Sequence, residues 1–171
     1  MKKILLILLF MISFGGFIFS QAAPEFKLTK EGIKPLIIEF DSSYTANTIY
    51  TRIKEWIALN NRYPSSVTRI DKQDELIKFS CYEKYAWKII NNNIDYWNEL
   101  KYTFTVEIKD YKCRITFESD EDRYDFWYNE NGTLKEKFKG SEASFEDTVN
   151  KTLTSLYDYI IGTEEEPPDD W

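Results

Sequence analysis

The side chains that could do chemistry in this chain are carboxylates, lysines, threonines and two cysteines, because the sequence contains no histidine. Without histidine, Ser-His-Asp and Cys-His nucleophile activation and every His-containing zinc or copper site are excluded. Cys81 and Cys113 alone are too few to close a structural zinc site. We therefore predict that the protein is not an enzyme and that it holds no metal and no cofactor.

The densest run of carboxylates lies between residues 118 and 125. Its acids could hold a hard cation such as Ca²⁺, which takes several oxygen ligands; they are Asp120, Glu121, Asp122 and Asp125. The full calcium-loop pattern D-x-[DN]-x-[DN]-G is missing, so no metal site is predicted here. Because paired carboxylates can hydrolyse glycosides, a histidine-free hydrolase that uses acids of the 118–125 loop is an alternative function.

A second set of polar residues alternates with apolar residues along Leu100–Lys109 and Lys112–Glu118. Such alternation over two neighbouring segments indicates an antiparallel hairpin with one buried and one wet face. Side chains of the wet face could form a polar ligand surface: Lys101, Thr103, Thr105, Arg114 and Thr116. The alternative is a solvent-exposed sheet face of β-forming residues with paired charges.

The other face of this hairpin is predicted to be buried beneath two helices, and it carries Tyr102, Phe104, Val106, Ile115 and Phe117. The first helix is predicted to follow the cap Thr45 and to end at Asn60–Asn61. Its apolar face consists of Ile49, Ile53, Trp56 and Ile57.

The last helix is predicted to start at Ser144, because Ser144-x-x-Asp147 resembles a capping box, and to stop at Gly162. Its apolar stripe consists of Phe145, Val149, Leu153, Leu156 and Ile160.

Further strands are predicted at Leu36–Phe40, Val67–Asp71 and Glu75–Tyr82, the first of them buried. Residues 125–139 could add a hairpin around the turn dipeptide Asn131-Gly132. Residues 83–99 are predicted to be a long, irregular insert; its Trp and Ile side chains favour a role in covering the core, and a functional role is the alternative. The resulting order β-α-β-β-β-β-α predicts an α+β, two-layer domain with a single antiparallel sheet.

The two ends of the chain differ in composition from its middle. Residues 1–22 contain two lysines, an apolar run and then small residues, which is the order of a secretory signal peptide; an uncleaved membrane anchor is the alternative. Residues 23–35 are predicted to be a polar lead-in, 36–162 a single domain, and 163–171 a disordered acidic tail. The expected location is periplasmic or secreted, with no stable membrane span after cleavage.

Charge and aromatic content narrow the range of partners. The formal net charge is −7, and an acidic chain is repelled by phosphate backbones, so nucleic acid is not expected as a partner. The 12 Phe, 12 Tyr and 5 Trp residues are predicted to fill the core. The alternative role for these aromatic residues is a platform for a carbohydrate or a hydrophobic ligand.

Three segments carry a resemblance to a known family: the helix YTRIKEWIA, the turn RIDKQDELIKF and the hairpin LKYTFTVEIKDYKCRITF. Over about Leu36 to Phe117 the chain resembles the exported bacterial family called domain of unknown function 4468. The resemblance implies a TATA-binding-protein-like fold and supplies no catalytic residue. It also implies that the Leu100–Lys109 strand lies between the strands of the two cysteines, so we expect two separate thiols.

The fold name suggests DNA binding, which the residues do not support. Proteins that read DNA through such a saddle use apolar wedges and basic residues on the outer sheet face, whereas this face carries threonines and mixed charge. The predicted function is an exported, non-catalytic binding or interaction module of the bacterial cell envelope. Its partner would be an unknown protein or small molecule; a structural subunit of an envelope assembly is a further alternative.

Overall fold

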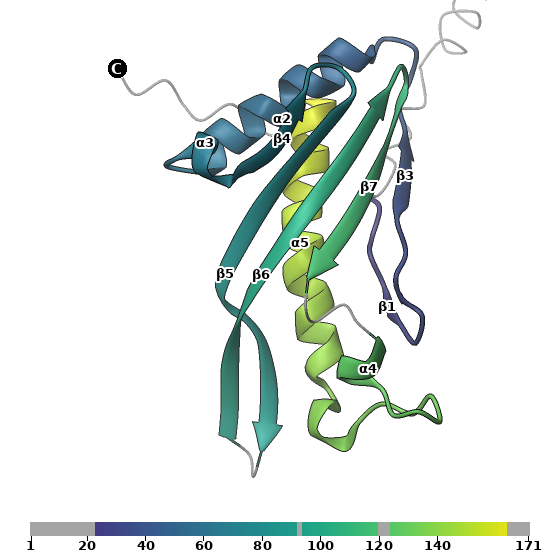
Figure 1. Cartoon of the computed structure of the whole chain (residues 1–171), viewed down its shortest axis with the longest axis vertical. Coiled ribbons are helices and arrows are strands. Elements are labelled where there is room, and N and C mark those ends of the chain that lie inside the picture. Colours follow the sequence, from purple (N-terminus) through teal and green to yellow (C-terminus); the bar gives the residue numbers. More distant parts are fainter. Residues whose placement is uncertain (1–22, 92–93, 120–123, 164–171) are drawn as a thin grey trace, which may run out of the picture.

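A computed structural model describes residues 23–91, 94–119 and 124–163 of the chain. Its main feature is a five-stranded antiparallel sheet in the order β3-β7-β6-β5-β4. The strands are β3 (Leu36–Glu39), β4 (Thr68–Lys72), β5 (Leu76–Asn91), β6 (Ile94–Lys109) and β7 (Lys112–Ser119). Helices α2 (Ala46–Asn60) and α5 (Ser141–Ile161) lie on one side of this sheet (Figure 1). The predicted α+β class with a single main antiparallel sheet is confirmed.

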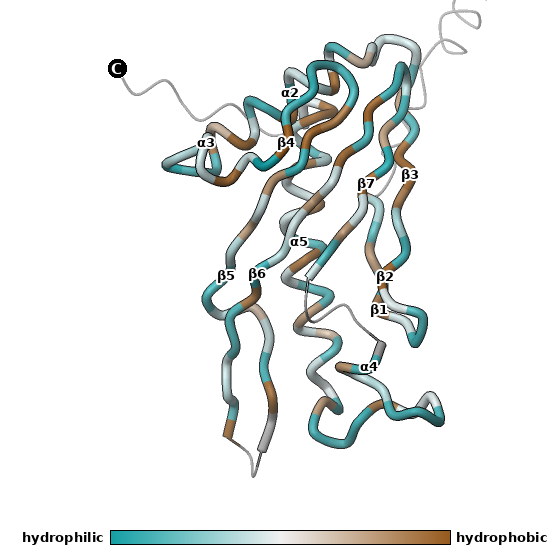
Figure 2. Tube along the Cα trace, viewed as in Figure 1, coloured by the Kyte–Doolittle hydropathy of each residue, from teal (hydrophilic) through white to brown (hydrophobic). Residues whose placement is uncertain are grey.

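The predicted hairpin is formed by β6 and β7, and its register separates the two faces as expected. Phe104 lies opposite Phe79 on β5 and Phe117 on β7, and all three side chains are buried. The predicted core residues Tyr102, Val106 and Ile115 are buried as well. The alternation of apolar and polar residues along these strands can be followed in Figure 2.

Both predicted helices are present, and the buried stripes of both are confirmed. The Thr45 side chain accepts a hydrogen bond from the backbone N–H of Thr48 and so caps α2. The predicted start of the last helix at Ser144 is wrong, because α5 begins one turn earlier, after Gly140 at a φ of 79°. Instead of capping the helix, the Ser144 hydroxyl donates to the Ser141 carbonyl and accepts from the backbone N–H of Lys88.

The predicted irregular insert at 83–99 is wrong. Strands β5 and β6 continue to pair up to Asn91 and Ile94, so the segment is a long two-stranded ribbon that extends past the sheet (Figure 1). The pairing register shifts between Glu83 and Trp87, which marks an irregularity of the β-bulge type. This shift breaks the period-2 pattern, and without that pattern the strand is not visible in the sequence.

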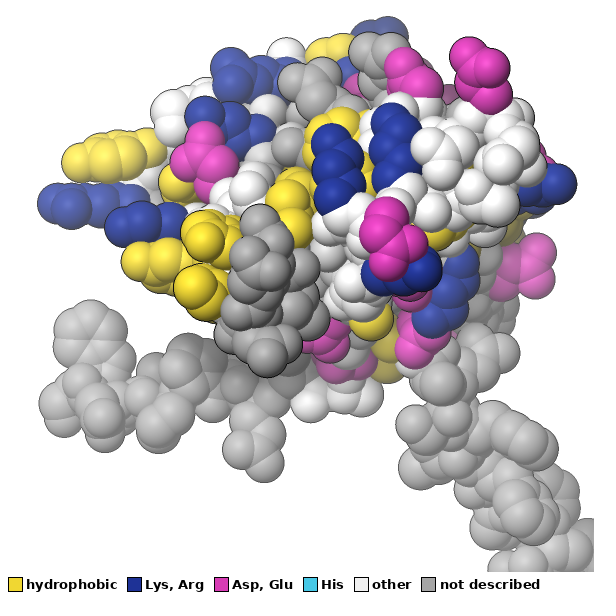
Figure 3. Space-filling model, turned by 90° about the horizontal axis from the view of Figure 1, so that it is seen from below, with side chains coloured by type: hydrophobic (Ala, Val, Ile, Leu, Met, Phe, Trp, Pro, Cys, Tyr) yellow, Lys and Arg dark blue, Asp and Glu magenta, His cyan; other side chains and the backbone are white. Residues whose placement is uncertain are grey.

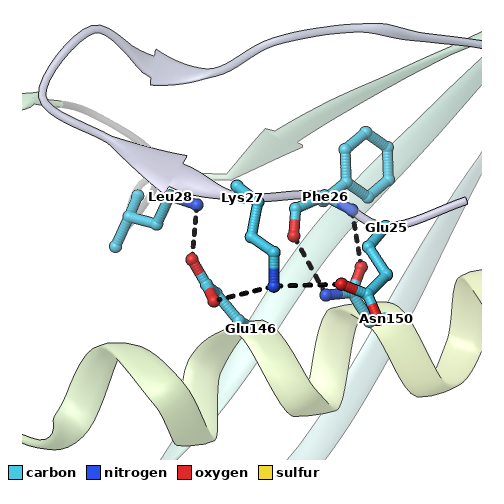
Figure 4. A network of polar contacts seen from close by, with 6 residues as sticks. All are labelled: Glu25, Phe26, Lys27, Leu28, Glu146 and Asn150. Carbon is cyan, nitrogen blue, oxygen red and sulfur yellow. Dashed lines mark hydrogen bonds and ion pairs between the residues drawn. The ribbon is translucent and has the colours of Figure 1, made fainter.

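The predicted polar lead-in at 23–35 is also wrong, since it forms the hairpin β1 (Leu28–Thr29) and β2 (Gly32–Ile33) and buries Phe26 and Leu28. The Asn150 side chain accepts from the Phe26 N–H at 2.7 Å and donates to its carbonyl at 3.0 Å. The Glu146 carboxylate accepts from the Leu28 N–H at 2.7 Å (Figure 4). We call residues 25–28 the N-terminal strap.

Two smaller expectations are corrected by the structure. The strand β3 is predicted to be buried, but it is an edge strand in which Ile37 is 67% exposed. The predicted hairpin within 125–139 is reduced to a single bridge, Tyr128 to Leu134, between the short helices α4 (Tyr124–Trp127) and η2 (Glu136–Phe138). A further short helix, α3 (Pro64–Val67), precedes β4.

The ends of the chain lie outside the described residues, and so do the predicted signal peptide at 1–22 and positions 164–171 of the predicted acidic tail. In the part of the chain that is described, no helix is both long and apolar enough to cross a membrane.

The two cysteines are expected to remain separate thiols. Cys81 on β5 lies opposite Tyr102, and Cys113 on β7 lies opposite Ile108, so β6 runs between them as predicted. Two strand spacings are about 9.5 Å, whereas a disulfide needs Cα atoms within about 7 Å. Burial raises the pKa of each thiol to about 12, which makes both unreactive in the native state.

Thiol labelling at pH 8 measures directly whether Cys81 and Cys113 are separate thiols. We expect little labelling of the native protein and two labelled thiols after denaturation without reductant. A denatured protein with no reactive thiol would contradict the strand order.

Candidate ligand-binding groove

The predicted polar surface lies on the sheet face away from α2 and α5. Thr105 is opposite Thr116, and Thr103 is opposite Glu118, so β6 and β7 bring these threonines together. The hydroxyls of Thr103 and Ser80 are 3.5 Å apart. The Thr105 hydroxyl is buried and has no hydrogen-bond partner within the described residues.

The two charged residues of this surface, Lys101 and Arg114, each form an ion pair with a nearby glutamate. Arg114 binds Glu107, and this hydrogen bond lowers the pKa of the Glu107 carboxyl. The Lys101 amine lies 3.3 Å from a Glu99 carboxylate oxygen. Exposed pairs of this kind contribute little to stability. The face has the threonine ladders and paired charges of a solvent-exposed sheet, and its role as a ligand surface stays a prediction.

A groove of about 470 Å³ lies elsewhere, beside β5, where β4 no longer covers that strand. One wall is the β5 segment Cys81–Ala86 together with Trp97 of β6. The opposite wall is α5 from Ser144 to Ser155, and the end of α2 at Asn60 and Asn61 closes one side. The groove is thus assembled from residues that are far apart in the sequence.

The floor of the groove consists of side chains that hydrogen-bond to one another. The Tyr102 hydroxyl donates to the Thr152 hydroxyl at 2.7 Å, and the Trp56 indole N–H donates to the Ser155 hydroxyl at 3.0 Å. Burial raises the pKa of the Tyr102 phenol and of the neighbouring Cys81 thiol, so both stay protonated at neutral pH. The floor is therefore neutral and holds no thiolate nucleophile.

The rim of the groove carries three aromatic side chains that are exposed to solvent. Tyr82, Tyr85 and Trp97 are 52%, 67% and 50% exposed. Lysine amines lie 5.4–5.8 Å from the centroids of these rings, at a distance where exposed cation–π contacts contribute about 0.5–1 kcal/mol. Seen from below, hydrophobic and basic side chains lie next to one another on this end of the molecule (Figure 3).

The segment that builds most of the sheet has relatives among known proteins. The model of the family "Domain of unknown function (DUF4468) with TBP-like fold" matches residues 38–120. This segment belongs to the DUF4468 family.

Two solved structures are similar to the chain. A TBP-like protein from Parabacteroides distasonis has a TM-score of 0.51 at 12% identity, covering 77% of this chain and 93% of that one. A DUF4468 family protein from Bacteroides ovatus has a TM-score of 0.48 at 12% identity, covering 89% of this chain and 95% of that one. The first likeness shows the TBP-like fold alone. No curated protein matches the sequence.

The DUF4468 segment supplies only part of the groove. Its residues 38–120 include the α2 end and the β5–β6 wall, whereas the α5 wall from Ser144 to Ser155 lies beyond it. Sequence reasoning missed the groove because it treated 83–99 as irregular and favoured a core-covering role for it over a functional one. The available signal was the run Tyr82-Glu83-Lys84-Tyr85, since tyrosines next to charged residues are unusual for a core-covering segment.

The acidic run at 118–125 contributes no described site. Asp120, Glu121 and Asp122 lie outside the described residues, and Asp125 is exposed on α4. Across 23–91, 94–119 and 124–163, no three His, Cys, Asp or Glu residues are grouped so as to hold a metal ion.

Proposed function

We propose that the protein is an exported, non-catalytic binding module of the bacterial cell envelope, and that the groove between β5 and α5 is its ligand site. The observation that carries the proposal is the three exposed aromatic side chains on the rim of a concave, polar groove. Ligand sites are concave, and exposed apolar groups gathered at one place mark interaction surfaces. The neutral, protonated floor favours binding over nucleophilic chemistry.

Export is supported by the sequence order of residues 1–22, which is that of a secretory signal peptide. We expect protein recovered from the cell envelope or the medium to have lost about twenty N-terminal residues, as measured by intact mass and N-terminal sequencing. A full-length product embedded in the membrane would contradict this expectation.

Ligand binding at the groove is tested by amide chemical-shift changes of the mature chain. The probes are a defined panel of soluble oligosaccharides and short peptides. We expect at least one probe class to shift amides of the groove walls. The variant Lys151→Trp should abolish the shifts, because residue 151 is an exposed position that lines the groove.

The matched control is Thr51→Trp, which places the same bulk at an exposed position of α2 that does not line the groove. This variant should bind as the parent does. If no probe shifts the groove residues, or if Lys151→Trp binds normally, the groove is not the ligand site.

A further inference from the structure

We infer that the ligand of the groove is a neutral or amino-bearing oligosaccharide, held by stacking on Tyr85 and Trp97. The inference rests on the proposed function and names its substrate class. It draws on three separate features of the groove: the exposed rings of the rim, the chemistry of the polar lining, and the state of the β5 edge beside it.

The exposed rings are the first feature. An aromatic ring offers a flat apolar face, and Tyr and Trp add a polar edge. A pyranose ring is the complement of this surface, because its C–H groups form apolar faces while its hydroxyls point outward along the edge. Tyr85 and Trp97 lie on opposite strands of the ribbon and both line the groove, so a chain of sugars can meet more than one ring.

The polar lining is the second feature. Amide and hydroxyl groups, which both donate and accept hydrogen bonds, come from Asn60, Asn61, Thr148, Thr152 and Ser155. Sugar hydroxyls also donate and accept, so they match this mixed lining. The charged groups of the lining are the carboxylates of Glu83 and Asp147 and the single amine of Lys151. Two carboxylates against one amine in the lining, in a chain of net charge −7, disfavour an anionic sugar. Of the lysines over the rim rings, Lys88 is paired with Asp95 and Lys101 with Glu99, which offsets their charge.

The β5 edge is the third feature, and it argues against an extended peptide. A peptide strand would need the backbone groups of β5 that β4 leaves uncovered beyond Phe79. Part of that edge is already occupied, since the Thr148 hydroxyl donates to the Ala86 carbonyl and Ser144 accepts from the Lys88 N–H. The register shift between Glu83 and Trp87 also bends the strand. Between the last β4 pair at Phe79 and this shift, the regular edge of β5 is limited to Ser80–Glu83. Such a short stretch favours recognition of the ligand by side chains over strand pairing.

Titration calorimetry with the mature chain tests the inference. The probes are hexasaccharides of β-1,4-glucose, β-1,4-N-acetylglucosamine and β-1,4-glucosamine, with hexagalacturonate as the anionic comparison. We expect at least one of the first three to bind and hexagalacturonate to bind more weakly. Tyr85→Ala and Trp97→Ala should each weaken binding about tenfold, whereas Tyr85→Phe should retain it.

The matched control is Tyr63→Ala, because Tyr63 is 64% exposed, like Tyr85 at 67%, but does not line the groove. This variant should bind as the parent does, and equal melting temperatures would show that all variants are folded. The inference is overturned if Tyr85→Ala and Trp97→Ala bind sugars normally, or if hexagalacturonate binds best. If peptides shift the groove amides and no sugar does, the groove remains a ligand site and only the sugar inference fails.

Discussion

Replacing Phe104 by alanine is expected to lower the free energy of unfolding by about 3–5 kcal/mol, the usual cost of truncating a fully buried phenylalanine. Phe104 is 0% exposed and lies on the central strand β6. Its ring centroid is 5.8 Å from that of Phe79 and 5.9 Å from that of Phe26. The cavity would therefore open between the sheet and the N-terminal strap. Rings of three segments meet there, and the remaining rings cannot shift far enough to fill the space left by Phe104. Urea denaturation followed by tryptophan fluorescence measures the change.

The control is the neighbouring residue on the same strand. Thr105 points to the opposite face, and its hydroxyl has no partner within the described residues, so no hydrogen bond is lost in Thr105→Ala. We expect this variant to cost well under 1 kcal/mol, as is typical away from the core. Equal costs for the two variants would mean that the register of β6 is wrong, because a slip by one residue exchanges the faces.

The parts of the fold that sequence analysis predicted are those fixed by local periodicity. The alternation along β6 and β7 identified the buried face, and the helical spacing of residues such as Ile53 and Leu153 identified the stripes of α2 and α5. In each case one face of one element carries the information, so no knowledge of distant partners is needed.

The parts that were missed depend on irregular backbone or on distant partners. The register shift between Glu83 and Trp87 interrupts the pattern of β5 and hid the ribbon. The start of α5 is decided by Gly140 in the left-handed region, which outweighs the capping pattern at Ser144. The N-terminal strap is fixed by Asn150, 124 residues away from Phe26.

The candidate groove was beyond sequence reasoning for the same reason. Its walls come from the end of α2, the β5–β6 ribbon and α5, and no single segment shows a concave surface. The polar residues predicted as a ligand surface do lie together, because they share one face of one hairpin. Local patterns can therefore place residues on a common face, whereas a cavity between elements requires the packing of those elements.

Replacing Asn150 by alanine is expected to have the second large effect, lowering the free energy of unfolding by about 2–6 kcal/mol. The Asn150 amide satisfies both the N–H and the carbonyl of Phe26 (Figure 4). If the strap stays in place, two buried backbone groups lose their partner, at about 1–3 kcal/mol each. If the strap detaches, water satisfies them, but the burial of Phe26 and Leu28 is lost, at about 1.5–3 kcal/mol for each side chain.

Hydrogen exchange at the strap distinguishes these two results and tests the long-range anchor. In the parent, the amides of Phe26 and Leu28 should be protected, because they donate to Asn150 and Glu146. In Asn150→Ala we expect the Phe26 amide to lose protection in either case, and loss at Leu28 as well would show that the strap has detached. Asn47→Ala is the control, since Asn47 is exposed on α2 and donates only to the Asp74 side chain among the bonds described. An Asn150→Ala variant as stable as the Asn47→Ala control, with Phe26 still protected, would show that Asn150 does not anchor the strap and that the packing of Phe26 and Leu28 with the Glu146 hydrogen bond suffices.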